Sequence, residues 1–287
     1  MPRAARSRTP ATFLQSVALR ARADESGRFP FNVPAIRSLA TLDLASPVTF
    51  FVGENGSGKS TLLEAIAIAS QVPAAGSHES WADPTLAAQR ALAGALRLSW
   101  SRRTRRGLFL RAEDFFGYAK RMDELSGQMA RELDAIAEAY ADRSAHARTL
   151  ASGPANASLA AVRNSYGDGL DARSHGQAFL AFLGARLSGP GLYLLDEPET
   201  PLSPQNQLAL LAHLHAAVED GAQFIIATHS PIVLAYPNAR IYAFDEDPVV
   251  EVAYDALDHV RLTRDFLRDP ARYLARICGP ATELDLG

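Results

Sequence analysis

Residues 53–60, GENGSGKS, constrain the fold of this chain more than any other segment. They fit the pattern GxxxxGK[ST] and lie between an apolar run, residues 48–52, and a segment rich in Ala, Leu and Ile, residues 62–70. A glycine-rich loop between a strand and a helix lets several backbone N–H groups point at one anion, and the helix N-terminus adds its positive dipole. The sequence therefore predicts a phosphate-binding loop, against the alternative of a glycine turn that only joins two elements.

The pattern also predicts roles for individual residues of the loop. We expect Lys59 to reach the β- and γ-phosphates of a nucleoside triphosphate, and Ser60 to offer its hydroxyl to Mg²⁺. The other nucleotide contacts that we expect are Asn55, Gly56, Ser57, Gly58 and Thr61. The predicted cofactors are therefore ATP and Mg²⁺.

A second apolar run, residues 192–195, ends in two carboxylates, Asp196 and Glu197. A buried strand that ends in acids places them at the carboxyl edge of a parallel sheet, where ligands of α/β folds bind. We expect Asp196 to hold Mg²⁺ through its water shell and Glu197 to act as general base toward the attacking water. An exposed acid pair at a strand end, with no role in catalysis, is the alternative interpretation.

The periodicity of the chain indicates an α/β fold. Short apolar runs at 48–52, 192–195, 224–227 and 241–244 alternate with helical segments such as residues 205–218, which is typical of buried parallel strands. We therefore predict a P-loop NTPase fold with a mostly parallel central sheet and helices on both of its faces.

We also predict one domain, residues 1–287, with a helical insertion at about residues 86–158. One stripe at helical spacing supports the insertion, and its members are Met122, Leu125, Met129, Leu133, Ile136 and Tyr140. Residues 152–158, rich in Gly, Ser and Asn, are interpreted as its flexible exit. Residues 255–277 are again predicted to be helical.

Composition limits the function classes. The net charge is −3, so the whole surface is not cationic enough to bind nucleic acid without a local patch. One cysteine, Cys278, excludes an intramolecular disulfide and suits a reducing compartment. No apolar run approaches the roughly 20 residues of a membrane span. Residues 1–9 are Arg-rich without a following apolar stretch, so we interpret them as a tail and expect a cytoplasmic protein with no integral membrane segment.

Three further segments resemble the ABC ATPase superfamily. Residues 174–177, SHGQ, are similar to its signature loop, with His175 in place of a glycine. Residues 199–204 resemble its D-loop, with Ser203 where many members have Asp. Residues 228–230 resemble its switch segment. The resemblance implies that Ser174, Gly176 and Gln177 contact ATP held by another subunit. It also implies a head-to-tail, ATP-dependent homodimer. It further implies that His229 contacts the γ-phosphate. Ser174 as a plain helix N-cap and His229 as a structural histidine remain open.

The likeness extends beyond the superfamily. Residues 108–113 (LFLRAE), 174–177, 223–236 (QFIIATHSPIVLAY) and 262–267 (LTRDFL) are similar to small, stand-alone bacterial predicted ATPases labelled AAA or AAA_21. This resemblance covers most of the chain after about residue 25. It implies an ABC-type P-loop NTPase fold, including antiparallel N-terminal strands, and the ATPase activity, without naming a cellular role.

The chain departs from the ABC pattern at two places. No glutamine stands at the usual Q-loop, and Arg111 or Glu113 is the candidate to face the nucleotide there, with a surface ion pair as the alternative. The aromatic residue that stacks on adenine is expected before the phosphate loop, where Phe29 and Phe31 are candidates and either could instead belong to the core.

One concentrated basic cluster is present, and its members are Arg97, Arg102, Arg103, Arg105, Arg106 and Arg111. Contact with nucleic-acid phosphates and a solvated loop are its two interpretations, of which the solvated loop is favoured.

Several functions fit these features. The first is a stand-alone ATPase whose dimer acts on an unidentified protein or nucleic-acid partner. The others are the ATP-binding subunit of an ABC transporter, a DNA-repair or defence-associated SMC-like ATPase, and an ATP-dependent switch that rarely turns over.

Overall fold

The computed structural model describes residues 12–20, 27–75, 86–166 and 175–278. The strands are β1 (Leu14–Leu19), β2 (Leu42–Asp43), β3 (Val48–Val52), β4 (Leu96–Trp100), β5 (Gly107–Arg111), β6 (Leu192–Asp196), β7 (Gln223–Ala227), β8 (Arg240–Ala243) and β9 (Val250–Glu251). The helices are α1 (Pro34–Arg37), α2 (Lys59–Ser70), α3 (Ala87–Ala95), α4 (Ala112–Ala139), α5 (Ala145–Tyr166), α6 (His175–Arg186), α7 (Pro204–Glu219), α8 (Pro231–Leu234), α9 (Asp258–Arg268) and α10 (Pro270–Cys278), with a 3-10 turn at Tyr254–Ala256.

The main sheet has six strands in the order β5-β6-β7-β3-β8-β9. All neighbours pair in parallel except β8 and β9, which are antiparallel. In this order β7 lies between β3, which leads into the predicted phosphate loop, and β6, which ends in the acid pair. The structure confirms the predicted α/β fold with a mostly parallel sheet.

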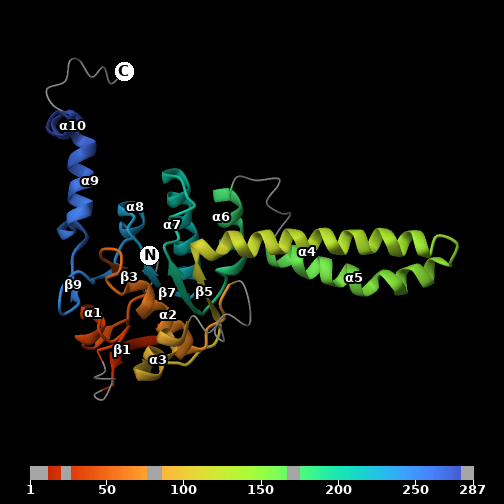
Figure 1. The fold of residues 1–287 in the computed structure, drawn as a ribbon, viewed down its shortest axis with the longest axis horizontal. Coiled ribbons are helices and arrows are strands. Elements are labelled where there is room, and N and C mark those ends of the chain that lie inside the picture. The colour runs from red at the N-terminus through yellow and green to blue at the C-terminus, as the bar shows by residue number, and fades with distance from the viewer. Residues whose placement is uncertain (1–11, 21–26, 76–85, 167–174, 279–287) are drawn as a thin grey trace, which may run out of the picture.

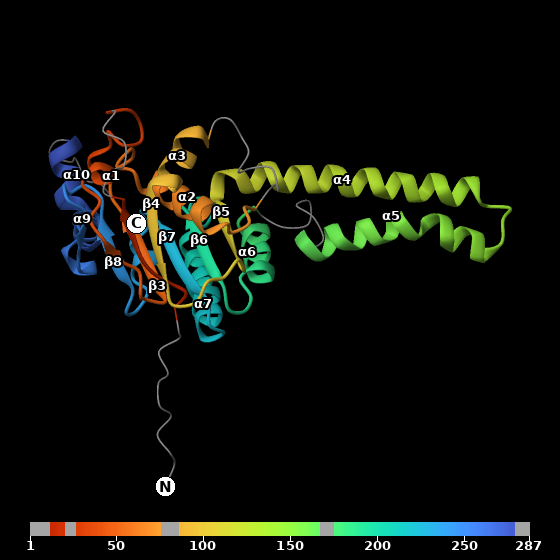
Figure 2. The same ribbon diagram turned by 90° about the horizontal axis from the view of Figure 1, so that it is seen from below.

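Both faces of the main sheet are buried, which explains why its strands are continuous apolar runs. Along β3, Phe50 packs into a core with α6 and α7, while the next residue, Phe51, packs into a core with α2. Successive side chains of a strand point to opposite faces, so one strand supplies both cores. In Figure 2 the helices α2 and α3 lie on one side of the sheet and α7 on the other.

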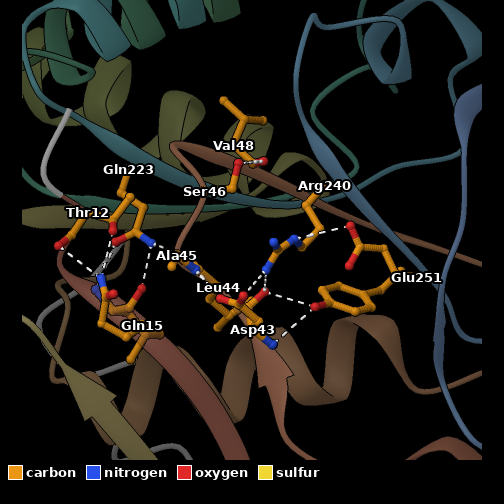
Figure 3. A network of polar contacts seen from close by, with 12 residues as sticks. Thr12, Gln15, Asp43, Leu44, Ala45, Ser46, Val48, Gln223, Arg240 and Glu251 are labelled. Carbon is orange, nitrogen blue, oxygen red and sulfur yellow. Dashed lines mark hydrogen bonds and ion pairs between the residues drawn. The ribbon is translucent and has the colours of Figure 1, made fainter. Parts of the chain in front are cut away.

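The second sheet has three antiparallel strands in the order β2-β1-β4, which confirms the predicted antiparallel N-terminal strands. Gln223, the first residue of β7, joins this sheet to the main one (Figure 3). Its side-chain oxygen accepts hydrogen bonds from the N–H groups of Phe13 and Leu14 at 2.8 and 2.9 Å. Its amide nitrogen donates to the carbonyls of Leu14 and Leu44 at 2.8 and 2.7 Å. All four hydrogen-bonding positions of this buried amide are therefore used.

A second set of polar contacts joins the same two sheets near β8 (Figure 3). The Tyr242 hydroxyl donates to the carbonyl of Asp43 at 2.9 Å, and Arg240 forms ion pairs with Asp43 and Glu251 at 2.5 and 3.2 Å. The carboxylates of both ion pairs are exposed, so these pairs add less to stability than the buried amide of Gln223 does.

The helices α4 and α5 form an antiparallel hairpin that extends well beyond the sheet (Figures 1 and 2). Four members of the predicted stripe, Leu125, Met129, Leu133 and Ile136, are half-buried on α4. The side chain of Met122 lies outside the described part, and Tyr140 follows the end of α4 and is exposed, so it is not part of a buried stripe. The predicted range 86–158 needs correction, because it also contains β4 and β5, which belong to the two sheets. Residues 152–158, predicted as a flexible exit, are helical within α5, where Ala155 is buried and Pro154 is tolerated.

The C-terminal region is helical, as predicted, and consists of α9 and α10. These helices lie on the side away from the hairpin (Figure 1), and α9 packs its Val260 into the core of the main sheet. Several of their apolar side chains are exposed, including Leu262, Leu267 and Ile277. Within the described ranges, no helix is both long and apolar enough to cross a bilayer.

Candidate functional site

The glycine-rich loop follows β3 directly and needs its glycines for conformation. Gly53, Gly56 and Gly58 have φ values of 146°, 84° and 104°, a region that residues with a Cβ rarely adopt. Space is also tight at Gly53, because an added Cβ would lie 2.9 Å from the Oδ1 of Asp245. The same Asp245 oxygen accepts a hydrogen bond from the N–H of Glu54 at 2.5 Å. The loop is therefore held in its curled shape by its own sequence and by Asp245, the second residue after β8.

Lys59, the first residue of α2, is buried and lies over this loop. Its Nζ donates to the carbonyls of Gly53 and Glu54 at 2.6 and 2.8 Å. Burial lowers the pKa of Lys59, while the nearby carboxylates of Glu197, Asp245 and Asp196 act in the opposite direction. The ammonium is thus aligned by carbonyls and surrounded by acids, which suits a group that meets phosphate oxygens.

The Ser60 hydroxyl connects the loop to the acidic strand end. It donates to the Oδ1 of Asp196, the last residue of β6, at 2.9 Å. The other oxygen of Asp196 accepts from the Nε of Arg111 at 3.2 Å. Burial raises the pKa of Asp196, and the adjacent Arg111 and Ser60 act to lower it. The structure therefore brings together the two residues predicted to hold the metal.

A cavity of about 250 Å³ opens beside this pair, and its lining residues are Ser60, Arg111, Glu113, Asp196 and Glu197. Hydroxyl and carboxylate oxygens are the donors that Mg²⁺ prefers, and Mg²⁺ usually keeps several waters and takes few protein ligands. The donor set of Ser60 and Asp196 fits such an ion. Both residues proposed for the place of the Q-loop, Arg111 and Glu113, lie at this cavity.

Glu197 lies at the turn that follows β6. Its φ of 49° is in the left-handed region, and its N–H donates to the carbonyl of Ala227 at 2.9 Å. This turn directs the carboxylate toward His229, whose Nε2 lies 3.7 Å from the Oε1 of Glu197. The predicted general base and the predicted switch histidine therefore come from neighbouring strands, β6 and β7, and meet at one edge of the sheet.

Glu199 is a residue of this site that sequence reasoning did not single out. Its Oε1 accepts a hydrogen bond from the backbone N–H of His229 at 2.7 Å. Burial raises the pKa of Glu199, and hydrogen bonds from Thr228 and His229 oppose the shift. The available signals were its position in the segment DEPET, three residues after Asp196, and its place at the start of the predicted D-loop, residues 199–204. Glu199 fixes the backbone on which His229 stands.

The predicted signature residues lie partly within the described chain. Ser174 falls outside the described residues, whereas Gly176 and Gln177 lie in the first turn of α6. Gly176 packs so closely on the segment after Glu197 that an added Cβ would lie 2.9 Å from the Pro201 carbonyl. This close packing places the start of α6 beside the predicted D-loop.

The other predicted nucleotide contacts lie on the loop or on α2. Asn55 and Gly56 are exposed, Ser57 is half-buried with its N–H donating to the Glu54 carbonyl at 3.2 Å, and Thr61 follows Ser60 on α2. The two predicted adenine-stacking residues differ in environment. Phe29 is 54% exposed and open to a ligand, while Phe31 is 8% exposed and belongs to the core around α2. Of the two, only Phe29 has a free face.

The basic cluster is divided in the structure. Five of its members are exposed on β4 and on the loop before β5, namely Arg97, Arg102, Arg103, Arg105 and Arg106. Arg111 is separate from them because it lies at the other end of β5, the carboxyl end. There it forms ion pairs with Asp196 and Glu64. Its membership in one basic patch was a wrong prediction.

Two families match parts of the chain. A family described as "AAA domain" matches residues 32–71, which include the glycine-rich loop. A family described as "AAA domain, putative AbiEii toxin, Type IV TA system" matches residues 171–235, which include the start of α6, the acid pair and His229. No curated protein resembles the sequence at a significant level. The two matched segments contain the predicted site residues on both sides of the α4–α5 hairpin.

Several solved structures match the chain at low identity and with TM-scores below 0.5. An Smc head domain with an extended coiled coil, bound to the C-terminal domain of ScpA from Pyrococcus furiosus, is 11% identical, with a TM-score of 0.45 over 90% of this chain and 99% of that one. A nucleotide-free ATP-binding cassette from an ABC transporter is 17% identical, with a TM-score of 0.46 over 91% and 99%. The SMC head domain from Thermotoga maritima is 17% identical, with a TM-score of 0.40 over 84% and 100%.

Proposed function

We propose that this chain, an ABC-type P-loop ATPase, binds Mg-ATP at the loop of residues 53–60 and hydrolyses it. The observation that carries the proposal is the 2.9 Å hydrogen bond between Ser60 and Asp196, which joins the glycine-rich loop to the acidic end of β6 beside an open cavity. A glycine loop alone binds anions, and an acid pair alone is common. The two together form the arrangement that a metal–triphosphate complex requires.

Each residue of the site has a distinct part in the proposed reaction. The curled backbone of the loop and the start of α2 donate N–H groups to the phosphates, and Lys59 exchanges its carbonyl partners for phosphate oxygens. Ser60, and Asp196 through water, would hold Mg²⁺, which would supply positive charge to neutralise the phosphates.

The carboxylate of Glu197 accepts a proton from the water that attacks the γ-phosphate. His229, held by Glu199 at its backbone, donates a hydrogen bond toward the γ-phosphate from the other side of the cavity.

We further propose that two copies act head to tail. The family resemblance assigns the start of α6 to the ATP of a second subunit, and Gly176 packs on the carbonyl of Pro201, within the predicted D-loop. In such a dimer, both composite sites would be assembled from the same two segments. A cyclic two-fold pair is also the commonest soluble assembly.

The projecting α4–α5 hairpin favours a stand-alone ATPase that engages a macromolecular partner (Figure 1). Its extension beyond the sheet offers an exposed surface that a nucleotide core does not need. A second candidate, an SMC-like ATPase associated with DNA repair or defence, is supported by the same hairpin. The ATP-binding subunit of a transporter is a third candidate, and a copurifying permease would support it.

The variant Glu197→Gln tests this proposal. It removes the base while keeping the size of the side chain, so ATP hydrolysis should fall by at least about a hundredfold while Mg-ATP binding persists. Size-exclusion chromatography with light scattering should then detect a dimer that depends on ATP, and a pull-down with this variant should recover the partner.

The matched control is Glu219→Gln, at the exposed end of α7, which should hydrolyse ATP at the wild-type rate. A Glu197→Gln protein that hydrolyses normally would exclude the assigned base. A variant that binds ATP but remains monomeric would exclude the head-to-tail model.

A further inference from the structure

The helices α9 and α10 form a C-terminal end whose apolar side is largely uncovered. The rings of Phe266 on α9 and Tyr273 on α10 pack edge to face with their centroids 5.8 Å apart, which joins the two helices. On the same helices Leu262, Leu267 and Ile277 remain 57%, 71% and 76% exposed. Apolar side chains gathered on a surface in this way mark a site that another molecule covers.

The polar side of the same two helices is basic. Residues 258–278 carry five arginines and three aspartates, a net charge of +2. Two of these arginines form ion pairs with nearby aspartates. The other three, Arg268, Arg272 and Arg276, are exposed and form no ion pair within the described part of the chain. The surface that covers this end must therefore combine apolar with acidic side chains.

The α4–α5 hairpin carries a surface of this kind. Helix α4 has seven acidic and three basic residues, a net charge of −4, and its exposed acids include Glu124, Glu132 and Glu138. The four apolar members of its stripe stay half-buried although α5 packs along α4. Two helices leave the seam between them open to one side, and helical bundles close such a seam with further helices. The hairpin is therefore complementary to the C-terminal end in both polarity and charge.

Within one chain the two surfaces lie at opposite ends of the molecule (Figures 1 and 2). At its start α9 packs against α8, which directly follows residues 228–230 at the nucleotide site. At the other end, Phe115 at the base of the hairpin packs on Phe179 of α6 with ring centroids 4.9 Å apart. A head-to-tail pair places the start of α6 in one copy opposite the nucleotide site of the other. It therefore also brings the C-terminal end of one copy toward the hairpin of the other.

We propose that the α9–α10 end of each copy docks on the α4–α5 hairpin of a second copy. The apolar sides of α9 and α10 cover the half-buried stripe, and the free arginines face the acids of α4. A two-fold axis repeats this contact, so each dimer contains it twice. The inference rests on the proposed function, because it requires the head-to-tail pair.

Cross-linking tests this contact directly. Cys278, at the end of α10, is exposed and is the one cysteine of the sequence. Gln128→Cys and Ala130→Cys, made separately, each add a thiol on one flank of the stripe on α4. In the Glu197→Gln background with Mg-ATP and a short bismaleimide, at least one of them should give a covalent dimer. Peptide mass spectrometry should locate the link between Cys278 and α4, and the link should be absent without nucleotide. The matched control, Asp220→Cys after α7, should give no such link.

Charge reversal tests the basic side of the contact. Arg272→Glu combined with Arg276→Glu should remove the cross-link, since like charges then face each other. The protein concentration for half-maximal ATP-dependent dimerisation, measured by light scattering, should rise by about tenfold or more. The matched control, Arg103→Glu combined with Arg105→Glu in the exposed loop before β5, changes the net charge equally and should alter neither property. All these proteins should bind a fluorescent ATP analogue with wild-type affinity, because none of the four arginines belongs to the nucleotide site.

The docking is refuted if the ATP-dependent dimer forms without a link from either thiol on α4, or if charge reversal on α10 leaves dimerisation unchanged. A link between the Cys278 side chains of two copies would show instead that the C-terminal ends pair with each other. Binding to phosphatidylglycerol vesicles that is lost on charge reversal, while dimerisation persists, would assign this end to an anionic membrane.

Failure of the docking is distinguishable from failure of the proposed function. A protein that binds the ATP analogue but stays monomeric in light scattering refutes the head-to-tail pair and the docking together. A protein that binds no nucleotide in the fluorescence titration refutes the proposed function itself. A dimer that depends on ATP but lacks the link refutes the docking alone.

Discussion

Replacing Gln223 by methionine should destabilise the protein strongly without touching the nucleotide site. The side chain is 1% exposed, and its amide makes four hydrogen bonds of 2.7–2.9 Å to the backbone of residues 13, 14 and 44. Methionine has a similar length and no amide, so all four bonds are lost while the volume is nearly kept. At about 1 kcal/mol for each bond, the free energy of unfolding should fall by about 4 kcal/mol.

Urea denaturation followed by circular dichroism measures this loss, with Gln128→Met on the exposed face of α4 as the matched control. The control should change the free energy of unfolding by less than about 0.5 kcal/mol. The reasoning is refuted if Gln223→Met loses no more than about 1 kcal/mol relative to the control. In that case, the contacts near Arg240 and the apolar core around α2 would suffice to join the two sheets.

Three further predictions concern the site. Gly53→Ala should abolish nucleotide binding, measured by titration with a fluorescent nucleotide. The φ of residue 53 is 146°, and the new methyl group would lie 2.9 Å from the Asp245 carboxylate. Binding with wild-type affinity would contradict the assigned loop geometry. His229→Ala should bind ATP but hydrolyse it about a hundredfold more slowly in a phosphate-release assay, and an unchanged rate would assign His229 a structural role. Burial raises the pKa of Glu199 in the folded protein above its ordinary value of 4.5, so the free energy of unfolding of the wild type should fall as pH rises from 4.5 through the folded-state pKa. Denaturation at several pH values should therefore show the free energy of unfolding of Glu199→Gln rising relative to that of the wild type over this interval. A difference between the two proteins that does not change with pH would exclude this effect.

The sequence predicted the main sheet well because its strands are buried on both faces. The apolar runs at 48–52 and 192–195 correspond closely to β3 and β6, and the glycine and acidic residues that follow them mark the carboxyl edge. β4 was missed as a strand because it belongs to a sheet with one solvated face. Its residues alternate between less and more exposed, with Leu96 buried and Arg97 exposed. Over only five residues, this two-residue period is hard to distinguish from the end of a helix.

Residues 152–158 show the opposite error. Their Gly, Ser, Pro and Asn content is typical of a loop, yet they lie within α5. Long-range packing against α4 stabilises the helix, and local propensity does not report such packing.

The candidate site was predictable where one segment carries the signal. Lys59, Ser60 and Asp196 follow from their motifs, and the structure places the last two 2.9 Å apart. Contacts between distant segments were not predictable in the same way. Arg111 is one of several arginines between residues 97 and 111, and only the pairing of β5 with β6 separates it from the exposed cluster and brings it to Asp196.

The most direct test of the account is calorimetric titration of the purified wild-type protein with ATP in the presence of Mg²⁺. The account predicts saturable binding with one nucleotide per chain, and loss of that binding in Lys59→Ala, whose methyl group cannot reach the phosphates. No saturable heat from the folded wild-type protein, or equal affinity in the lysine variant, would contradict the claim that residues 53–60 and the acidic end of β6 form a nucleotide site.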